Sequence, residues 1–108
     1  MPTRKVPHRR RLAIEDVAGH SNHIAASNLD AALRFLDAIE STVELLCQFP
    51  EAGGMAPTTR PETKGLRVKL VAGFSNYMIL YFVTNETIDI VRVVRGGQEL
   101  DQIALQSR

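Results

Sequence analysis

The sequence has one cysteine, no tryptophan and few aromatic residues, which make up 6% of its 108 residues. A single thiol, Cys47, excludes an internal disulfide and a metal centre built from several cysteines, and it fits a reducing compartment. No apolar run approaches the roughly 20 residues that span a bilayer, and the N-terminal segment lacks the apolar stretch of a secretory signal. We therefore expect a cytoplasmic protein without a membrane segment.

Signatures of cofactor, metal and catalytic sites are also missing. The sequence contains no Walker-type glycine loop. His20 and His23 share a predicted helix with Asp16, but nothing marks the further ligand that a metal site needs, so a hydrogen-bonded, partly exposed His20 is the favoured interpretation. Cys47 lies among apolar neighbours, where burial raises the pKa of a thiol and makes it inert. We expect no metal, no cofactor and no catalytic constellation.

Charge is nearly balanced in total but uneven along the chain. Thirteen basic and 12 acidic residues give a net charge of +1. Residues 1–11 carry five basic residues and no acid, whereas residues 12–51 carry seven acids against Arg34 alone. This distribution predicts two electrostatically different faces, the alternative being that helices simply carry solvating acids. The basic N-terminal residues are expected to be solvated, with contact to DNA in a larger complex as the alternative.

Two helices are predicted in the first half of the chain. Apolar residues recur at helical spacing after Pro7, a residue suited to opening a helix, and they predict a helix over residues 8–26. Asn28 then offers an N-cap, and a regular apolar stripe predicts a second helix over residues 29–49. Because so few residues separate them, residues 8–49 should form an antiparallel αα-hairpin.

The second half changes to strand periodicity. Residues 66–70 alternate between apolar and polar, residues 77–83 are apolar throughout, as in a central strand covered on both faces, and residues 88–94 are rich in β-branched side chains. These three segments predict consecutive antiparallel strands. Residues 4–6 are a candidate for a fourth strand at an edge, and residues 98–106 for a short last helix.

The elements together predict an α+β fold in a single domain over residues 1–108. The αα-hairpin packs on one face of a three- to four-stranded, mainly antiparallel sheet, in a two-layer arrangement of order β-α-α-β-β-β. One sheet face and a groove between helix and sheet are expected to stay uncovered and to present apolar surface to a partner. In a domain of this size any function must lie on a surface or in a shallow groove.

Four basic residues on the predicted sheet are the candidate functional residues. Arg67 and Lys69 point the same way from one strand, and Arg92 and Arg95 lie on or just beyond another. Such a group is suited to nucleic acid, an acidic protein surface or an acidic partner segment, the alternative being the solubility of an exposed sheet face. Aromatic residues for stacking on bases are sparse.

Four segments, in their order and spacing, carry a family resemblance: SNLDAALRFLDAIESTVELLCQFPEAGG, RPETKGLRVKLV, NYMILYFV and IDIVRVVRGG. They resemble the ParE branch of the RelE/ParE toxin superfamily, the toxin halves of bacterial type II toxin-antitoxin modules. The similarity runs from about Val6 to Leu100. The order β-α-α-β-β-β, which the periodicity predicts independently, is the order of this family.

The resemblance implies a toxin that acts by protein binding. It implies that the protein binds DNA gyrase, traps it on cleaved DNA and blocks replication in the bacterial cytoplasm. It also implies a ParD-type antitoxin, a ribbon-helix-helix DNA binder whose flexible C-terminal segment wraps the toxin, so that operator DNA is contacted only through the antitoxin. We expect Arg67, Lys69, Arg92 and Arg95 to contact acidic residues of the partner or target.

The ribosome-dependent ribonucleases of the superfamily provide an alternative. They place basic residues on the second strand, an arginine near the start of the third, an arginine after the fourth, and a tyrosine or histidine near the C-terminus. Here Arg67 and Lys69 match, but Met78 stands at the expected third-strand arginine, the position after the fourth strand falls near Gly97, and the tail DQIALQSR has neither tyrosine nor histidine.

These departures argue against ribonuclease activity, because cleavage by a ribose hydroxyl needs charge stabilisation and proton transfer at the phosphate. A RelE-type mRNA endoribonuclease and a non-toxic partner-binding adaptor with the same fold are therefore kept as alternatives to the gyrase-binding toxin.

Overall fold

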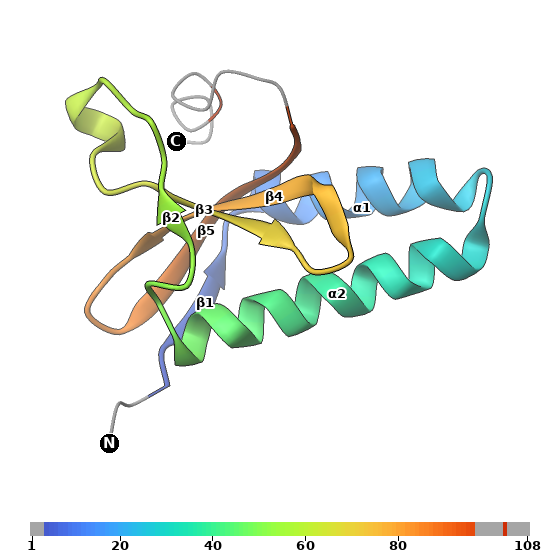
Figure 1. Ribbon diagram of the computed structural model, residues 1–108, viewed down its shortest axis with the longest axis horizontal. Helices are drawn as coiled ribbons and strands as arrows, with labels where there is room; N and C mark the ends of the chain where they lie inside the picture. Colours follow the sequence, from blue (N-terminus) through green and yellow to red (C-terminus); the bar gives the residue numbers. More distant parts are fainter. Residues whose placement is uncertain (1–3, 97–102, 104–108) are drawn as a thin grey trace.

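The computed structural model describes residues 4–96 and Ile103, and it has the predicted α+β order. The elements are, in chain order, β1 (Val6–Arg9), α1 (Arg11–Ala25), α2 (Leu29–Gln48), β2 (Gly54–Met55), the 3-10 helix η1 (Pro61–Thr63), β3 (Arg67–Val71), β4 (Phe74–Val83) and β5 (Thr87–Arg95) (Figure 1). The two-residue β2 and η1 lie in the turn-rich segment before β3 and were not predicted.

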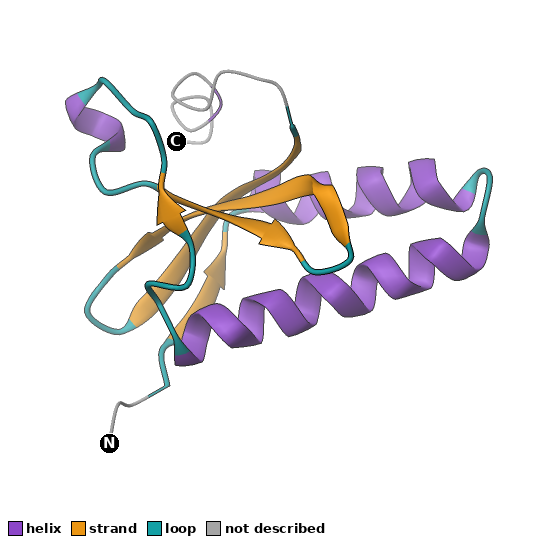
Figure 2. Cartoon of the chain, viewed as in Figure 1, coloured by secondary structure: helices purple, strands orange, loops and turns teal. Residues whose placement is uncertain are grey.

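The helices form one layer and the strands the other. Figure 2 shows α1 and α2 running alongside each other as a hairpin that extends past one end of the sheet. The sheet has five strands in the order β1-β5-β4-β3-β2, against the three or four predicted. β1 pairs with β5 in parallel, and the other neighbours are antiparallel. The apolar segment 77–83 lies in the central strand, β4, as predicted.

The first helix begins later than its sequence suggests. Pro7 does not open a helix but lies in β1, opposite Ile88 of β5. The Val6 N–H donates to the Glu86 carbonyl and the Arg10 N–H to the Ile90 carbonyl, so alternate residues of β1 donate to β5. The Pro7 nitrogen falls between these donors and faces the open edge, where a missing N–H costs nothing. The edge strand therefore covers residues 6–9 rather than 4–6.

The second helix follows its pattern closely. The Asn28 side chain accepts a hydrogen bond from the Ala31 N–H at 2.9 Å and caps the helix, as predicted. Its apolar stripe packs on the sheet: Phe35 and Leu46 are fully buried, in one core cluster with Ile79 of β4. The hydrophobic effect of this face, rather than helix propensity, holds the hairpin on the sheet.

The opposite sheet face is not left uncovered, and that prediction is wrong for this part of the molecule. Leu80 of β4 and Val91 of β5 are fully buried there, beneath Ala56, Leu66 and Ile103. The irregular segment between β2 and β3 thus supplies a second, smaller core. The predicted helix over residues 98–106 lies outside the described residues, except for Ile103, which is helical. In the described part of the chain, neither helix combines the length and apolarity that crossing a membrane requires.

Candidate functional site

Arg92 is held in an internal ion pair. Its Nε and Nη2 atoms donate to the two oxygens of the Asp16 carboxylate on α1 at 2.6 and 2.9 Å, and this carboxylate also accepts the Val93 N–H at 3.0 Å. The side chains of Arg92 and Asp16 are only 19% and 15% exposed. The hydrogen bonds that Arg92 donates to the Asp16 carboxylate raise the pKa of Arg92. This placement argues against the expected partner contact by Arg92, whose charge is already neutralised.

His20 and Cys47, which the sequence offers as a metal ligand and a nucleophile, are packed within the fold. His20 Nε2 lies 2.9 Å from the Val93 carbonyl oxygen, and its ring packs edge-on against Tyr77, which confirms the partly exposed, hydrogen-bonded histidine. Cys47 is 1% exposed, and burial raises the pKa of its thiol, as predicted. Within residues 4–96 and 103, no three histidine, cysteine or carboxylate side chains come together to hold a metal ion.

Arg95 is an exposed cation at the end of β5. Its guanidinium carbon lies 6.0 Å from the centre of the Tyr77 ring, which is the outer limit of a cation–π contact. Tyr77 is the partner of Arg95 in the strand ladder, and the same strand pairs Tyr81 and Ile79 with Arg67 and Lys69. Arg95 is therefore separated from Arg67 by the length of several residues along β4.

Arg67 and Lys69 are brought together by β3, as predicted. They lie opposite Tyr81 and Ile79, whose side chains belong to the core under the helices. Partners in a ladder share a sheet face, so both cations lie on the side of α2, at the margin of the sheet. Both are half-buried. The four predicted residues thus form one adjacent pair, one separate surface cation and one internal ion pair.

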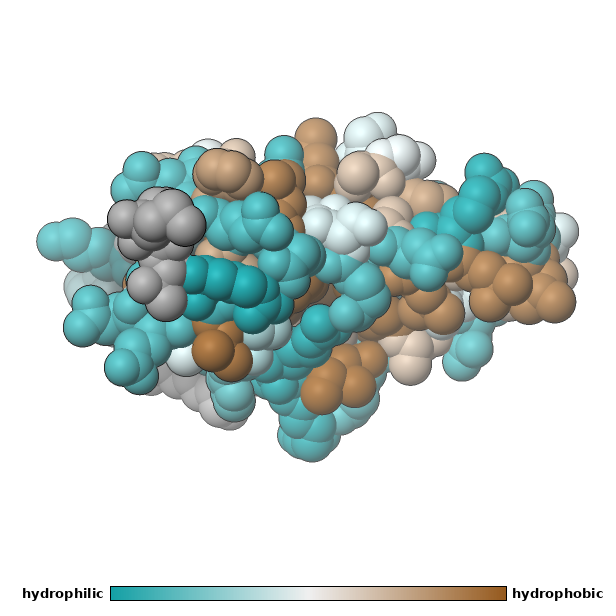
Figure 3. Space-filling view, turned by 90° about the horizontal axis from the view of Figure 1, so that it is seen from below, coloured by the Kyte–Doolittle hydropathy of each residue, from teal (hydrophilic) through white to brown (hydrophobic). Residues whose placement is uncertain are grey.

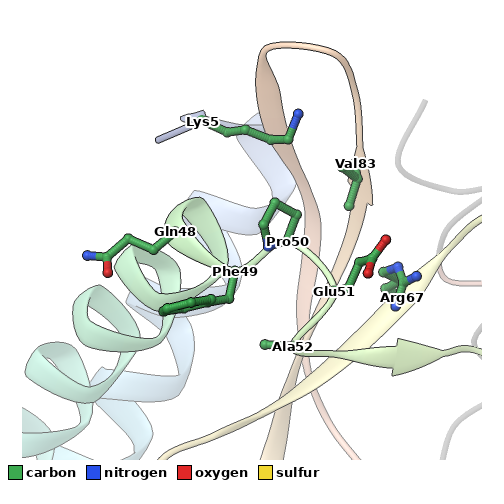
Figure 4. A pocket seen from close by; sticks show the side chains of 8 residues that line it. All are labelled: Lys5, Gln48, Phe49, Pro50, Glu51, Ala52, Arg67 and Val83. Atoms are coloured by element: carbon green, nitrogen blue, oxygen red, sulfur yellow. The ribbon is translucent and has the colours of Figure 1, made fainter. Parts of the chain in front are cut away.

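Arg67 lines an open hollow of about 540 Å³ at the C-terminal end of α2 (Figure 4). Figure 4 shows the Phe49 ring on the helix side of this hollow, Lys5 at its far rim, and Glu51 beside Arg67. We call this site the Arg67 hollow; its lining residues are Lys5, Gln48, Phe49, Pro50, Glu51, Ala52, Arg67 and Val83.

The wall of the hollow is fixed by a buried tyrosine. The Tyr81 hydroxyl donates to the Pro50 carbonyl at 2.8 Å and accepts the Gly53 N–H at 2.9 Å. Tyr81 is fully buried, and this burial raises its pKa. A side chain at Gly53 would meet the Tyr81 hydroxyl at 2.5 Å and the Val68 carbonyl oxygen at 2.7 Å, so only glycine fits. The loop from Pro50 to Gly53 is therefore fixed to β4, and with it the Gly53 carbonyl that accepts a hydrogen bond from Arg67.

The two cations of the hollow are bound to neutral acceptors. Arg67 Nη1 donates to the Gly53 carbonyl at 2.6 Å. Lys5 Nζ donates to the carbonyls of Thr84 and Asn85, each at 2.8 Å. Neither forms an ion pair with a carboxylate in the described part of the chain. Their charges are fixed in position but not neutralised, and neither Lys5 nor the exposed ring of Phe49 was identified from the sequence.

Half of the basic residues that the structure describes are, by contrast, paired internally. Ion pairs with acidic side chains involve Arg4, Arg9, Arg10, Arg11, Arg34 and Arg92. The basic N-terminal segment is thus not simply solvated, because Glu44 and Glu40 of α2 and Asp89 of β5 take up three of its arginines. The two electrostatic faces predicted from the sequence largely cancel. Among residues 4–96, the basic residues without such a partner in the described part of the chain are Lys5, Arg60, Lys64, Arg67, Lys69 and Arg95.

Apolar side chains are also exposed along α2. Figure 3 shows the lower face of the molecule, where hydrophobic patches are separated by hydrophilic side chains. Leu29 and Leu33, near the start of α2, are 66% and 54% exposed, and Phe49, just after its end, is 59% exposed. Of these, Phe49 lies next to unneutralised cations, in the Arg67 hollow.

Comparisons with known proteins are consistent with this fold. Residues 9–100 match the family described as the ParE toxin of the type II toxin-antitoxin system parDE. Among solved structures, a chain of the chromosomal ParDE toxin-antitoxin system from P. aeruginosa matches with a TM-score of 0.71 and 21% sequence identity, covering 89% of this chain and 100% of that chain. At this identity the likeness shows a shared fold. The search of curated proteins gave no match.

Proposed function

The chain belongs to the family of ParE toxins of type II toxin-antitoxin systems, and from this premise we propose that it inhibits DNA gyrase by binding and is neutralised by a ParD-type antitoxin. Family membership confirms the resemblance found in the sequence. The proposal adds a target, a partner and a mode of action in the bacterial cytoplasm, with no bond broken or formed by the toxin itself.

The chemistry around Arg67 and Lys69 supports binding rather than catalysis. Cleavage of RNA needs a group that transfers a proton at the reacting phosphate. Tyr81, the phenol beside Arg67, is fully buried, its hydroxyl is committed to Pro50 and Gly53, and its pKa is raised. Met78 packs half-buried in the second core cluster, so its position on β4 supplies no cation.

The surface that we propose for partner and target contains Arg67, Lys69 and Arg95. These cations keep their charge, whereas Arg92 is neutralised by Asp16. Positive side chains fixed on a folded surface favour association with acidic protein segments and increase its rate. Operator DNA is then contacted through the antitoxin.

A supercoiling assay with purified gyrase and purified toxin tests the target. We expect the toxin to inhibit supercoiling and to accumulate cleaved DNA, and we expect no transcript cleavage when it is added to translating ribosomes. Replacing Arg67 and Lys69 together by glutamine should weaken inhibition. The matched control replaces Arg60 and Lys64, two exposed cations near η1, and should leave inhibition unchanged.

Two results would contradict the proposal. Site-specific cleavage of mRNA on the ribosome would identify the RelE-type alternative. Harmless overproduction of the folded chain in cells lacking the antitoxin would identify the adaptor. Neutralisation is tested by co-expressing the product of the neighbouring gene, which we expect to be a ribbon-helix-helix protein that restores growth and co-purifies with the chain.

A further inference from the structure

We propose that the Arg67 hollow receives an extended segment of the antitoxin in which acidic and apolar side chains alternate. A carboxylate of the segment binds the Arg67 guanidinium, and the next apolar side chain packs on Phe49. The inference rests on the proposed function, because it takes the occupant to be a protein partner, and it specifies the chemistry that this partner must present.

The guanidinium of Arg67 is fixed in position and has N–H donors left to bind a carboxylate. One edge is anchored, since Nη1 donates to the Gly53 carbonyl, which the buried Tyr81 holds in place through the Gly53 N–H. The remaining N–H groups have no protein acceptor among the residues that the structure describes. A planar fork with fixed orientation and unneutralised charge matches the two oxygens of a carboxylate. Lys5, at the rim of the same hollow, adds a second positive charge.

The apolar requirement comes from α2. Phe49 is 59% exposed and Leu45, one helical turn earlier, is 39% exposed, so the two form an apolar strip. This part of α2 lies near β3, because the Ala72 N–H, just after β3, donates to the Thr42 hydroxyl of α2, and Phe49 lines the same hollow as Arg67. Lys69 continues the cations of β3 in the same direction. An apolar strip and a cationic strip thus lie next to each other.

An extended segment satisfies both strips. Successive side chains of an extended chain point to opposite sides, so acidic residues at alternate positions face β3 while the residues between them face α2. A helix would place residues of one kind three and four apart and would be too wide to lie against β3 at this margin. The pattern expected in the partner is therefore acidic, apolar, acidic, apolar.

Glu51 provides a substitution that is expected to strengthen binding rather than weaken it. This exposed carboxylate lies beside Arg67 in the hollow but forms no ion pair with it in the described part of the chain. An incoming carboxylate is repelled by Glu51 and attracted by Arg67. Removing the negative charge of Glu51 should therefore strengthen binding of an acidic segment, whereas loss of a merely structural side chain would weaken it or have no effect.

The test uses the purified full chain and the short synthetic peptide acetyl-Gly-Glu-Leu-Glu-Leu-Glu-Gly-amide, titrated at low salt with amide chemical shifts as the readout. We expect shifts at the residues of the Arg67 hollow. Arg67→Gln should weaken binding by about tenfold or more, and Glu51→Gln should strengthen it by about two- to fivefold. Phe49→Ser should weaken it as well, while the control Arg60→Gln leaves it unchanged.

Four outcomes would overturn the proposal: equal binding of the peptide with Gln in place of Glu, no gain for Glu51→Gln, an equal loss for Arg60→Gln, or tighter binding of a single-stranded oligonucleotide in the hollow. Arg67→Lys, which keeps the charge without the fork, should bind with intermediate affinity. Glu51 is exposed and its replacement leaves the fold intact, so the test stands even if Arg67→Gln unfolds. The titration contains no gyrase, so its failure leaves the proposed target untouched, and inhibition of gyrase can fail while the peptide still binds.

Discussion

Replacing Asp16 by alanine is expected to destabilise the fold more than replacing its partner Arg92 by leucine. Asp16 joins α1 to β5 through three hydrogen bonds, two from the Arg92 guanidinium and one from the Val93 N–H. Without the carboxylate, a guanidinium that is 19% exposed loses its counter-charge and a backbone N–H loses its acceptor. Arg92→Leu is milder, because Asp16 keeps the Val93 N–H and the new side chain keeps part of the packing.

The burial of the pair sets the magnitude. Exposed ion pairs contribute about 0–1 kcal/mol, and removing one partner of a fully buried pair costs about 3–5 kcal/mol. At 15–19% exposure this pair lies between the two limits. Adding the unsatisfied Val93 N–H, we expect a loss of about 3 kcal/mol for Asp16→Ala and about 2 kcal/mol for Arg92→Leu. The double variant should lose less than the sum, because the two side chains act on one interaction.

Urea unfolding of the four proteins of this double-mutant cycle, followed by circular dichroism, measures these values. Asp37→Ala serves as the control, since Asp37 is an exposed acid on α2 outside the ion pairs of the described residues, and it should change the free energy of unfolding by less than about 0.5 kcal/mol. If Asp16→Ala behaves like this control, or if the two single changes simply add, the ion pair does not hold α1 on β5 and the reasoning is refuted.

Three further predictions concern stability and reactivity. The hydrogen bond from Arg4 lowers the pKa of Glu44 to about 2, so the ionised Glu44 stabilises the fold above its usual pKa near 4.5, and this stabilisation is lost as the pH falls toward 2. In a plot of the urea unfolding midpoint against pH, Glu44→Gln should reduce the slope in this range. An unchanged slope would contradict the prediction. Cys47 should resist a thiol reagent in buffer and react in urea, whereas fast labelling of the native protein would show an exposed thiol. Gly53→Ala should lower stability by about 1–3 kcal/mol because its Cβ meets Tyr81, while Gly54→Ala, with no atom near its Cβ, should be nearly neutral in the same unfolding assay.

Local pattern was sufficient for most of the elements. The stripe of α2, the Asn28 cap and the apolar β4 are each specified within a few residues, and each is found as predicted. The beginning of α1 was misjudged because Pro7 suits the first turn of a helix and an edge strand equally well. The choice is made some eighty residues later in the chain, where the carbonyls of Glu86, just before β5, and Ile90 of β5 accept the N–H groups of Val6 and Arg10.

The candidate site was less predictable, because it depends on which charges meet after folding. Arg67 and Lys69 were found from strand alternation, which fixes their common side. The ion pair of Arg92 depends on the packing of α1 against β5 and on a bulge in the ladder where β4 passes from Leu80 to Tyr81. Phe49 is the last residue of the helix predicted over residues 29–49, but it follows the final helical turn and its ring is exposed.

The surface that a partner meets is decided by internal neutralisation rather than by the charge of each segment. The N-terminal segment has the highest density of basic residues in the sequence, yet Arg4, Arg9 and Arg10 are bound by acids of α2 and β5 and offer little net field. Arg67 is bound by a carbonyl, which fixes its direction without reducing its charge. Because attraction at a surface depends on charge that is both fixed and unneutralised, we expect Arg67 to attract an acidic partner more strongly than the paired Arg4, Arg9 and Arg10 do.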